Sequence, residues 1–213
     1  MAAQERAIRT RRNIMLAAAT VFNERGYKAA TIADILSKAG VTKGALYFHF
    51  PSKDELAQEV LASQNRDFVV PDRQSKTQEV VDVVMLHTHR LQNDPMVRAA
   101  VRLTMDQLST EFDRTGPFRQ WAEVTRERLE KARSQGELLP HVVPAETADV
   151  MVGSYAGVQS MSHALSEYSD LTARANALLR HLLPSIVLPS VLASVDIAED
   201  RGARVYAEIQ ATA

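Results

Sequence analysis

Apolar residues recur along most of the chain at spacings of three and four, the repeat of an amphipathic α-helix. The first such stripe lies within residues 5–25, where we expect a helix, and Gly26 follows it as a stop signal. Two short predicted helices come next. One begins at Thr31 and ends at Gly40, and the other has Thr42 as its N-cap and ends before Pro51. Two short helices joined by a tight turn that contains glycine predict a helix-turn-helix.

The remainder of the chain also has a helical pattern. Ser52 and Glu55 form an S-x-x-E capping box, which predicts a fourth helix reaching about residue 67. Later helices are expected over residues 77–92, 95–108, 117–135, 144–166 and 171–183. A last helix is expected over residues 191–210, with an interruption near Gly202. Few alternating or β-branched runs occur, so the pattern predicts an all-α protein.

Composition sets the class of protein. The chain has 213 residues, of which 46% are hydrophobic and 24% charged, as is typical of a globular protein. This length fits either one large domain or a small module attached to a larger one. There is no cysteine, which excludes disulfides and thiolate metal sites. No apolar stretch approaches the roughly 18 residues of a membrane span, and the start lacks a signal segment, so we expect a cytoplasmic protein without membrane contact.

Net charge changes the picture once it is resolved along the chain. The overall value of −1 argues against a polyanionic partner. However, residues 1–53 contain nine basic and three acidic side chains, a net of +6, and the other 160 residues contain 16 basic and 23 acidic ones, a net of −7. Accidental clustering on a solvated surface is one interpretation. The basic residues fall on and around the predicted helix-turn-helix, which favours nucleic acid as the partner.

Motifs of enzymes do not appear in the sequence. There is no G-x-S-x-G, no glycine-rich phosphate loop and no H-E-x-x-H. His87 and His89 are two positions apart on a predicted helix, so their side chains diverge, and we expect no metal site and satisfied or exposed histidines. A small all-helical enzyme or a helical adaptor remains the alternative of another class.

The predicted helix-turn-helix offers groups suited to DNA. Lys43, at the start of its second helix, can reach O6 or N7 of a guanine, and Gly44 lets the backbone approach a thymine methyl closely. Ala45 is small enough not to obstruct the groove. The backbone amides of Thr42, Lys43 and Gly44 point outward with the positive end of the helix dipole. For Thr31 the sequence favours capping alone, with capping plus a phosphate contact as the alternative, while Arg9 or Arg6 can reach the backbone or minor groove from the first helix.

Residues 40–56, GVTKGALYFHFPSKDEL, resemble the signature of the TetR family of transcriptional repressors. Farther along, GYKAATIADIL, VRLTMDQ, GPFRQW, GELLPHV, VGSYAGVQ and RGARVYAE resemble the γ-butyrolactone autoregulator receptors of filamentous actinobacteria. The resemblance implies nine or ten helices, with a DNA-binding domain over residues 1–52 and a ligand-binding and dimerisation domain over residues 53–213. It also implies phosphate contacts from the positions that match the family, which are Tyr47, His49 and Lys53.

The same resemblance implies a ligand cavity. The single tryptophan, Trp121, matches a residue that lines the cavity for the acyl chain of the lactone in these receptors. An apolar pocket also needs a few placed polar groups to hold a carbonyl or hydroxyl. The expected lining is Gln64, Met85, Phe118, Trp121, Thr125, Val158 and Gln159. Gln64 is of particular interest because its helix is expected to connect the two domains. A ligand that moves this helix could then change the spacing of the two DNA-binding domains in a dimer.

The implied assembly is a homodimer. Gly153 and Gly157 share one helix face, where small residues permit close approach of another helix, either within one subunit or between two. The family pairs its eighth and ninth helices across a two-fold axis, with Leu178 and Leu182 in the buried seam. We therefore expect a repressor that binds palindromic double-stranded operator DNA and is released by a lactone or butenolide, controlling secondary metabolism without a cofactor. The alternative within this fold is a pseudo-receptor that answers to an antibiotic or to no lactone.

Overall fold

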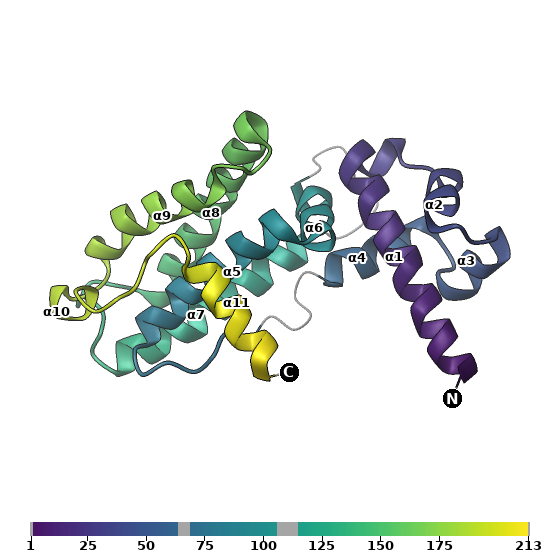
Figure 1. The fold of residues 1–213 in the computed structure, drawn as a ribbon. Coiled ribbons are helices and arrows are strands. Elements are labelled where there is room, and N and C mark those ends of the chain that lie inside the picture. The colour runs from purple at the N-terminus through teal and green to yellow at the C-terminus, as the bar shows by residue number, and fades with distance from the viewer. Residues whose placement is uncertain (1, 64–68, 106–114, 213) are drawn as a thin grey trace. The chain divides into compact units, whose positions relative to one another are not determined.

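The structure is a computed structural model that describes residues 2–63, 69–105 and 115–212 (Figure 1). These residues form eleven α-helices, one short 3-10 turn and no strand beyond a single bridge between Leu138 and Val187. The all-α prediction is confirmed. None of the helices in the described ranges is long and apolar enough to cross a membrane. The chain forms two compact units, which we call the head (residues 1–68 and 94–117) and the body (residues 69–93 and 118–213).

The head begins with a long helix, α1 (Ala2–Ala29), which is broken near its end by Gly26. The backbone of Gly26 has φ 75° and ψ 169°, a conformation that glycine adopts at little cost. The predicted stop is therefore confirmed, although one more helical turn follows it. Ile14, Ala18 and Phe22 of α1 are fully buried, as the spacing of apolar residues predicts.

The helix-turn-helix consists of α2 (Ile32–Ala39) and α3 (Lys43–His49). Thr31 and Asp34 form a reciprocal capping box that starts α2, and Gly40 ends it with a left-handed backbone at φ 63°. Thr42 starts α3, its hydroxyl accepting a hydrogen bond of 3.3 Å from the Ala45 amide. Both predicted caps and the stop at Gly40 are confirmed. The caps thus fix the ends of both helices, and with them the length of the turn.

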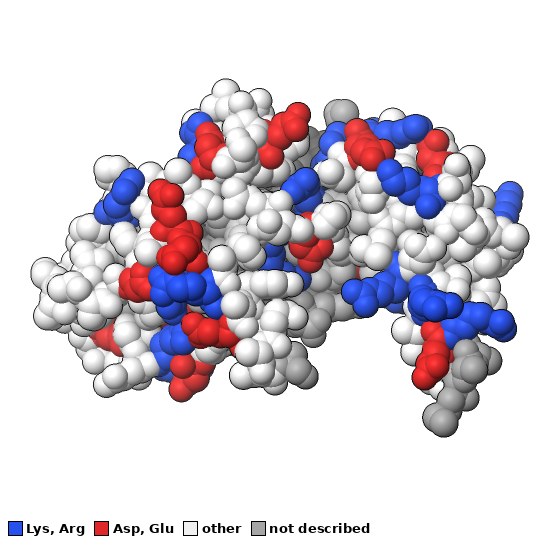
Figure 2. Space-filling view, in the orientation of Figure 1, with Lys and Arg blue, Asp and Glu red and all other residues white. Residues whose placement is uncertain are grey.

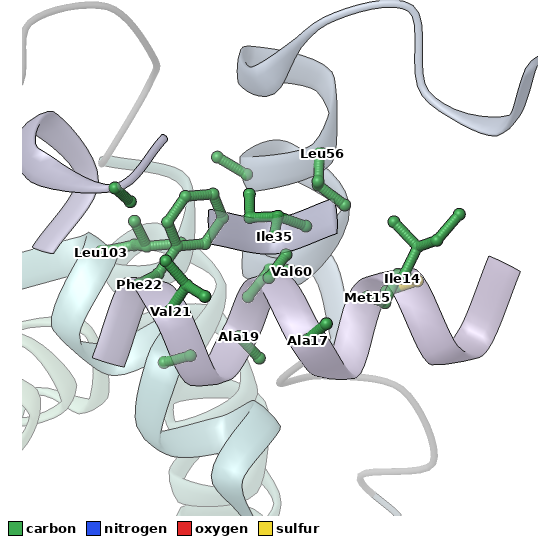
Figure 3. Close-up of a cluster of buried hydrophobic side chains, with 14 of the residues drawn as sticks. Ile14, Met15, Ala17, Ala19, Val21, Phe22, Ile35, Leu56, Val60 and Leu103 are labelled. Carbon is green, nitrogen blue, oxygen red and sulfur yellow. The ribbon is translucent and has the colours of Figure 1, made fainter. Parts of the chain in front are cut away.

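Two further helices complete the head, α4 (Lys53–Ser63) and α6 (Pro95–Met105). Leu56 and Val60 of α4 and Leu103 of α6 are buried in one cluster with Phe22 of α1 and Ile35 of α2 (Figure 3). The Arg102 guanidinium donates to the Asn23 carbonyl and adds a polar tie between α6 and α1. Ser52 Oγ accepts from the Glu55 amide at 3.0 Å, so the predicted cap of α4 is formed. The head core therefore includes Leu103, which lies 54 positions after His49, the last residue of the helix-turn-helix.

The division into compact units does not coincide with the expected domain boundary between residues 52 and 53. Helices α4 and α6 belong to the head because their apolar stripes complete its core. A module of only about 50 residues buries too little surface to be stable on its own without such additions. The predicted C-terminal ends of these helices, residues 64–67 and 106–108, lie outside the described residues.

The body contains α5 (Lys76–Asn93), most of α7 (Thr115–Ser134), α8 (Pro144–Ser166), α9 (Leu171–Leu182), the 3-10 turn η1 (Leu183–Ser185), α10 (Pro189–Leu192) and α11 (Arg201–Thr212). Helices α8 and α9 pack side by side, and α5 packs against both α9 and α11 (Figure 1). The buried carboxylate of Glu137 accepts hydrogen bonds from the Lys76 and Thr77 amides at 3.0 and 2.7 Å. It thereby caps α5, the central helix of this unit.

The C-terminal segment differs from the expected single helix over residues 191–210. Helix α10 is one turn long, residues 193–200 are not helical, and Gly202 lies inside α11 rather than at a break. The cause is tertiary, since the Gln78 side chain bonds both the amide and the carbonyl of Asp196, at 2.7 and 3.1 Å. Gly202 permits close contact instead, because a methyl group there would overlap the Met85 carbonyl of α5.

Candidate functional site

Basic side chains gather on the head. Figure 2 shows Lys and Arg side chains over the N-terminal half of α1, where Arg6, Arg9 and Arg12 are exposed. Arg11 is instead engaged with Glu59 at 2.9 Å and lies 4.8 Å over the Phe50 ring. The exposed guanidinium groups, Arg9 among them, are thus available to phosphate oxygens, which are the usual partners of arginine on DNA.

Helix α3 presents an outer face on which several of the predicted contact residues are exposed. Lys43 and Gly44 are exposed, and the Lys43 ammonium lies 5.9 Å over the ring of Tyr47. A methyl group added to Gly44 would meet no atom within 4 Å, and the backbone there is not in the left-handed region. Packing within the head therefore does not require glycine at this position. Leu46 and Phe50 are buried, as expected of core residues.

Other predicted contacts have partners within the head. Thr31 Oγ1 accepts from the Asp34 amide at 3.1 Å and donates to its carboxylate at 2.7 Å, which supports its capping role. The Lys53 ammonium lies 4.1 Å over the ring of Tyr27, and Tyr27 donates to Asp54. Ala45 and His49 are half-buried. DNA contacts from all of the predicted residues of the head, Lys43, Gly44 and Arg9 included, stay predictions.

The body contains a second candidate site, built from α5, α7 and α8. The buried ring of His87 lies 4.8 Å from the Trp121 ring and 5.6 Å from the Tyr155 ring. The hydroxyl groups of Thr88 and Tyr155 form a 2.8 Å hydrogen bond. Gln159 lies near His87, one helical turn after Tyr155. We call these five residues, His87, Thr88, Trp121, Tyr155 and Gln159, the body cluster.

The body cluster is polar but uncharged. Burial, with a smaller contribution from the positive charge of Arg90, lowers the pKa of His87 to about 4, so its imidazole is neutral at pH 7. Burial also raises the pKa of Tyr155, which keeps its phenol protonated. Gln159 is 7% exposed, and its Oε1 accepts no hydrogen bond within the described part of the chain. A buried acceptor of this kind is a candidate for a hydrogen bond to a bound molecule.

The structure brings together only some of the predicted ligand residues. Trp121 and Gln159 belong to the body cluster, and Thr125 is buried one turn after Trp121. Phe118, 37% exposed, lines a surface groove of about 480 Å³ between α7 and α8. Met85 is core and Val158 is half-buried. Gln64 lies outside the described residues.

Comparison with known proteins places the chain in a family. Residues 14–60 match the model of bacterial regulatory proteins of the tetR family, and residues 75–188 match a tetracyclin repressor-like C-terminal domain. The A-factor receptor protein of Streptomyces griseus is 37% identical over 92% of this chain and 70% of its own length. The chain belongs to the TetR family. It is a TetR-family transcriptional repressor, and the relatives that it matches are transcriptional regulators.

Solved structures of TetR proteins agree with this fold. TylP, a TetR regulator from Streptomyces fradiae, superposes with a TM-score of 0.87 at 43% identity, covering 96% of this chain and 99% of that one. CprB of Streptomyces coelicolor, in complex with its operator sequence, gives a TM-score of 0.72 at 27% identity over 96% and 98% of the two chains. An ArpA-like γ-butyrolactone receptor gives 0.73 at 26% identity over 98% and 100%.

Sequence reasoning missed several residues of this TetR protein. His87 was expected to be a satisfied or exposed histidine, yet it lies at the centre of the body cluster, while His89 diverges toward Tyr206 as expected. Thr88 and Tyr155 were not singled out. The sequence spacing could have identified both residues. Thr88 directly follows His87, and Tyr155 is one helical turn before Gln159, so it shares a helix face with that residue.

Proposed function

We propose that this TetR-family repressor binds a palindromic operator as a homodimer and leaves it when a small neutral γ-butyrolactone or butenolide enters the body. The A-factor receptor relative and the ArpA-like γ-butyrolactone receptor support this ligand class. A further similar structure, described as the molecular basis for control of antibiotic production by a bacterial hormone, supports a role in secondary metabolism; it has a TM-score of 0.76 at 28% identity.

The buried acceptor of Gln159 is the observation that carries the ligand proposal. Gln159 lies near His87, whose ring is 4.8 Å from that of Trp121, in a cluster whose His and Tyr side chains are neutral. A lactone or butenolide with a hydroxyl group can donate to this oxygen while its apolar chain packs on the aromatic rings. Placing a carboxylate among these uncharged groups would carry a large desolvation penalty. The cluster therefore favours the closed lactone over its ring-opened acid.

The dimer proposal is supported by the exposed face of α8. Gly153 and Gly157 are exposed, and a methyl group on either would meet no atom within 4 Å, so packing within one subunit does not explain them. Val150, Met161 and Leu165 are exposed on the same helix, at 54%, 53% and 68%. Leu178 and Leu182 of α9 are half-buried. An exposed apolar stripe of this kind favours burial against a second helix pair.

The ligand proposal predicts the behaviour of Gln159→Leu, which keeps the side-chain volume but removes the buried acceptor. We expect the variant to shift operator DNA as the wild type does, and to need about 5 to 150 times more lactone for release, the range expected for one lost buried hydrogen bond. The measurement is a gel shift on the operator with a panel of γ-butyrolactones and butenolides. Ser160→Ala, on the adjacent exposed position, is the matched control and should respond like the wild type.

Two results would contradict the ligand proposal. One is that the wild-type protein stays bound to its operator at saturating concentrations of every lactone and butenolide tested, while an antibiotic tested in the same assay releases it. The other is equal affinity for lactone with and without operator, because ligand and DNA must weaken each other by the same factor. A separate test concerns the lactone itself. Lactone recovered from the protein after release of the operator should be chemically intact, because an effector, unlike a substrate, is not converted.

The DNA proposal separates the roles of two lysines. Lys43→Ala should weaken binding to the operator by about 1 to 3 kcal/mol and weaken binding to random duplex much less, because a base contact carries sequence information. Lys53→Ala should weaken both duplexes alike and lower the slope of log affinity against log salt by about 1. Gel shifts at several salt concentrations measure both quantities. An equal loss on operator and random DNA for Lys43→Ala would refute the base contact.

Lys53 needs one additional control because its ammonium packs over Tyr27. A thermal unfolding curve of Lys53→Ala distinguishes weaker DNA binding from a weaker head. If the head unfolds at a lower temperature while the salt slope stays the same, the phosphate contact of Lys53 is wrong.

A further inference from the structure

Phe48 is the most exposed large hydrophobic side chain within the described residues, at 81%. Phe48 lies on α3. The apolar residues two positions before and after it, Leu46 and Phe50, are buried instead, at 0% and 1% exposed. Among the described residues, the ring of Phe48 makes an edge contact with the neighbouring His49, at 5.1 Å between centroids. The ring therefore contributes little to the head core, and leaving it in water is unfavourable.

The helix repeat defines which face Phe48 shares. Successive residues of an α-helix are rotated by about 100°, so positions 43, 44, 47 and 48 fall within one arc of about 140°. The exposures agree, because Lys43, Gly44, Tyr47 and Phe48 are all exposed, while Leu46, about 160° from Phe48 on this repeat, is buried. Ala45 and His49 lie between the two faces and are half-buried. Phe48 thus belongs to the surface that carries Lys43, and His49 lies at its margin.

DNA is the occupant favoured by the charge around this face. The exposed arginines of α1 and Lys43 are cationic, and residues 1–53, which include α1 and α3, carry nine basic and three acidic side chains. The apolar group that a base edge presents in the major groove is the C5 methyl of thymine. On such a surface the cationic groups can contact phosphates while the phenyl ring contacts a thymine methyl. An apolar protein partner would match the ring but not the surrounding positive charge.

We propose that Phe48 contacts a thymine methyl in each half-site of the operator and so selects thymine beside the base pair that Lys43 reads. This inference rests on the proposed DNA-binding function and adds a specificity-determining residue to it. The contact is apolar, so it adds affinity and sequence preference without changing the number of phosphates neutralised.

Replacing thymine by deoxyuridine tests the contact directly, because the two bases differ only by the methyl group. The operator is the tightest duplex recovered by the full-length wild-type protein from a library of randomised palindromes. Each thymine pair, one in each half-site, is then replaced in turn. At one position we expect the wild type to lose about fourfold in affinity per methyl removed, or about 16-fold for both half-sites. Phe48→Ala should bind the thymine and uracil duplexes equally well.

A matched variant on the same face controls for a general effect of the substitution. Tyr47→Phe removes a hydroxyl group but keeps the ring, so it should retain the full sensitivity to the methyl group. The salt slope of Phe48→Ala should equal that of the wild type, since no charge is removed. Phe48 is exposed, so the variant should also unfold at the wild-type temperature.

The possible failures are distinguishable. If the wild type recovers no duplex from the library, the DNA-binding function itself is overturned. If it recovers an operator but binds every uracil duplex as tightly as thymine, or if Phe48→Ala stays sensitive to the methyl group, only the role of Phe48 is overturned. A change in oligomer size caused by Phe48→Ala, without a change in methyl sensitivity, would likewise overturn it in favour of a protein contact.

Discussion

Replacing Asp82 by alanine should lower the free energy of unfolding of the body by about 3 to 5 kcal/mol, because the buried Arg201 guanidinium loses its bidentate partner and keeps only a 3.5 Å pair with Asp196. Asp82 is fully buried, and Arg201 of α11 donates to both of its carboxylate oxygens at 2.7 Å. Arg73 and Gln78 donate to it as well, at 2.8 and 2.9 Å. One carboxylate thus joins α5, α11 and the segment before α5.

The electrostatics of Asp82 explain the size of the effect. Burial by itself raises the pKa of the carboxyl, but the hydrogen bonds from Arg201, Gln78 and Arg73 outweigh it and hold the pKa below its ordinary value. The charged form is therefore favoured in the folded state, and its stabilising contribution is present at neutral pH and lost as the pH falls through the lowered pKa. Removal of the side chain forfeits that contribution at pH 7.

The measurement is urea unfolding at pH 7, monitored through the fluorescence of Trp121. This residue is the only tryptophan of the chain and belongs to the body. Asp200→Ala is the matched control. Asp200 pairs with Arg204 at 3.1 Å but is largely exposed, and such pairs contribute about 1 kcal/mol or less. A loss for Asp82→Ala no larger than that of Asp200→Ala would show that α11 is held by apolar packing alone.

Acidification from pH 6.5 to pH 4 should cost the body about 3 kcal/mol through His87 alone. Its pKa is about 4 in the folded protein because burial, and then the charge of Arg90, disfavours the imidazolium. In the unfolded chain the same group titrates near 6.5, so the unfolded state binds the additional proton in this interval. The stability is therefore complete above about pH 6.5 and declines as the pH falls to about 4, at about 1.4 kcal/mol per pH unit.

Urea unfolding of the wild type and His87→Gln between pH 7 and pH 4.5 isolates this effect. Carboxylates contribute to the pH dependence of both proteins, so the difference between their two slopes is the quantity to compare. We expect His87→Gln to have the shallower slope even if it is less stable at pH 7. His181→Gln, at an exposed position of α9, should keep the wild-type slope. Parallel slopes for the wild type and His87→Gln would contradict a neutral buried histidine.

The head could be predicted closely from the sequence. Its helix limits depend on local signals, the caps at Thr31, Thr42 and Ser52 and the glycines at positions 26 and 40, and all of these are formed in the structure. Local hydrogen bonds and backbone preferences act over three or four residues, so they can be recognised in a linear sequence.

The limits of prediction appear where distant segments meet. Residues 193–200 have a helical pattern, but Gln78, more than 100 positions earlier, holds Asp196 outside a helix. Gly202 looks like a helix breaker, yet it lies within α11 because a side chain there would collide with Met85. Neither contact leaves a trace in the local pattern of apolar and polar residues.

The sequence by itself therefore determined the all-α class, the helix-turn-helix and the charge division between its two parts, because each depends on neighbouring residues or on their sum. The tertiary structure decided which residues form the body cluster and which face of α3 is outward. His87, Trp121 and Tyr155 come from three helices, and only packing brings their rings within 6 Å. Seven residues of α3 are too few for periodicity to fix an outward face, whereas burial of Leu46 and Phe50 against the other head helices leaves Phe48 exposed.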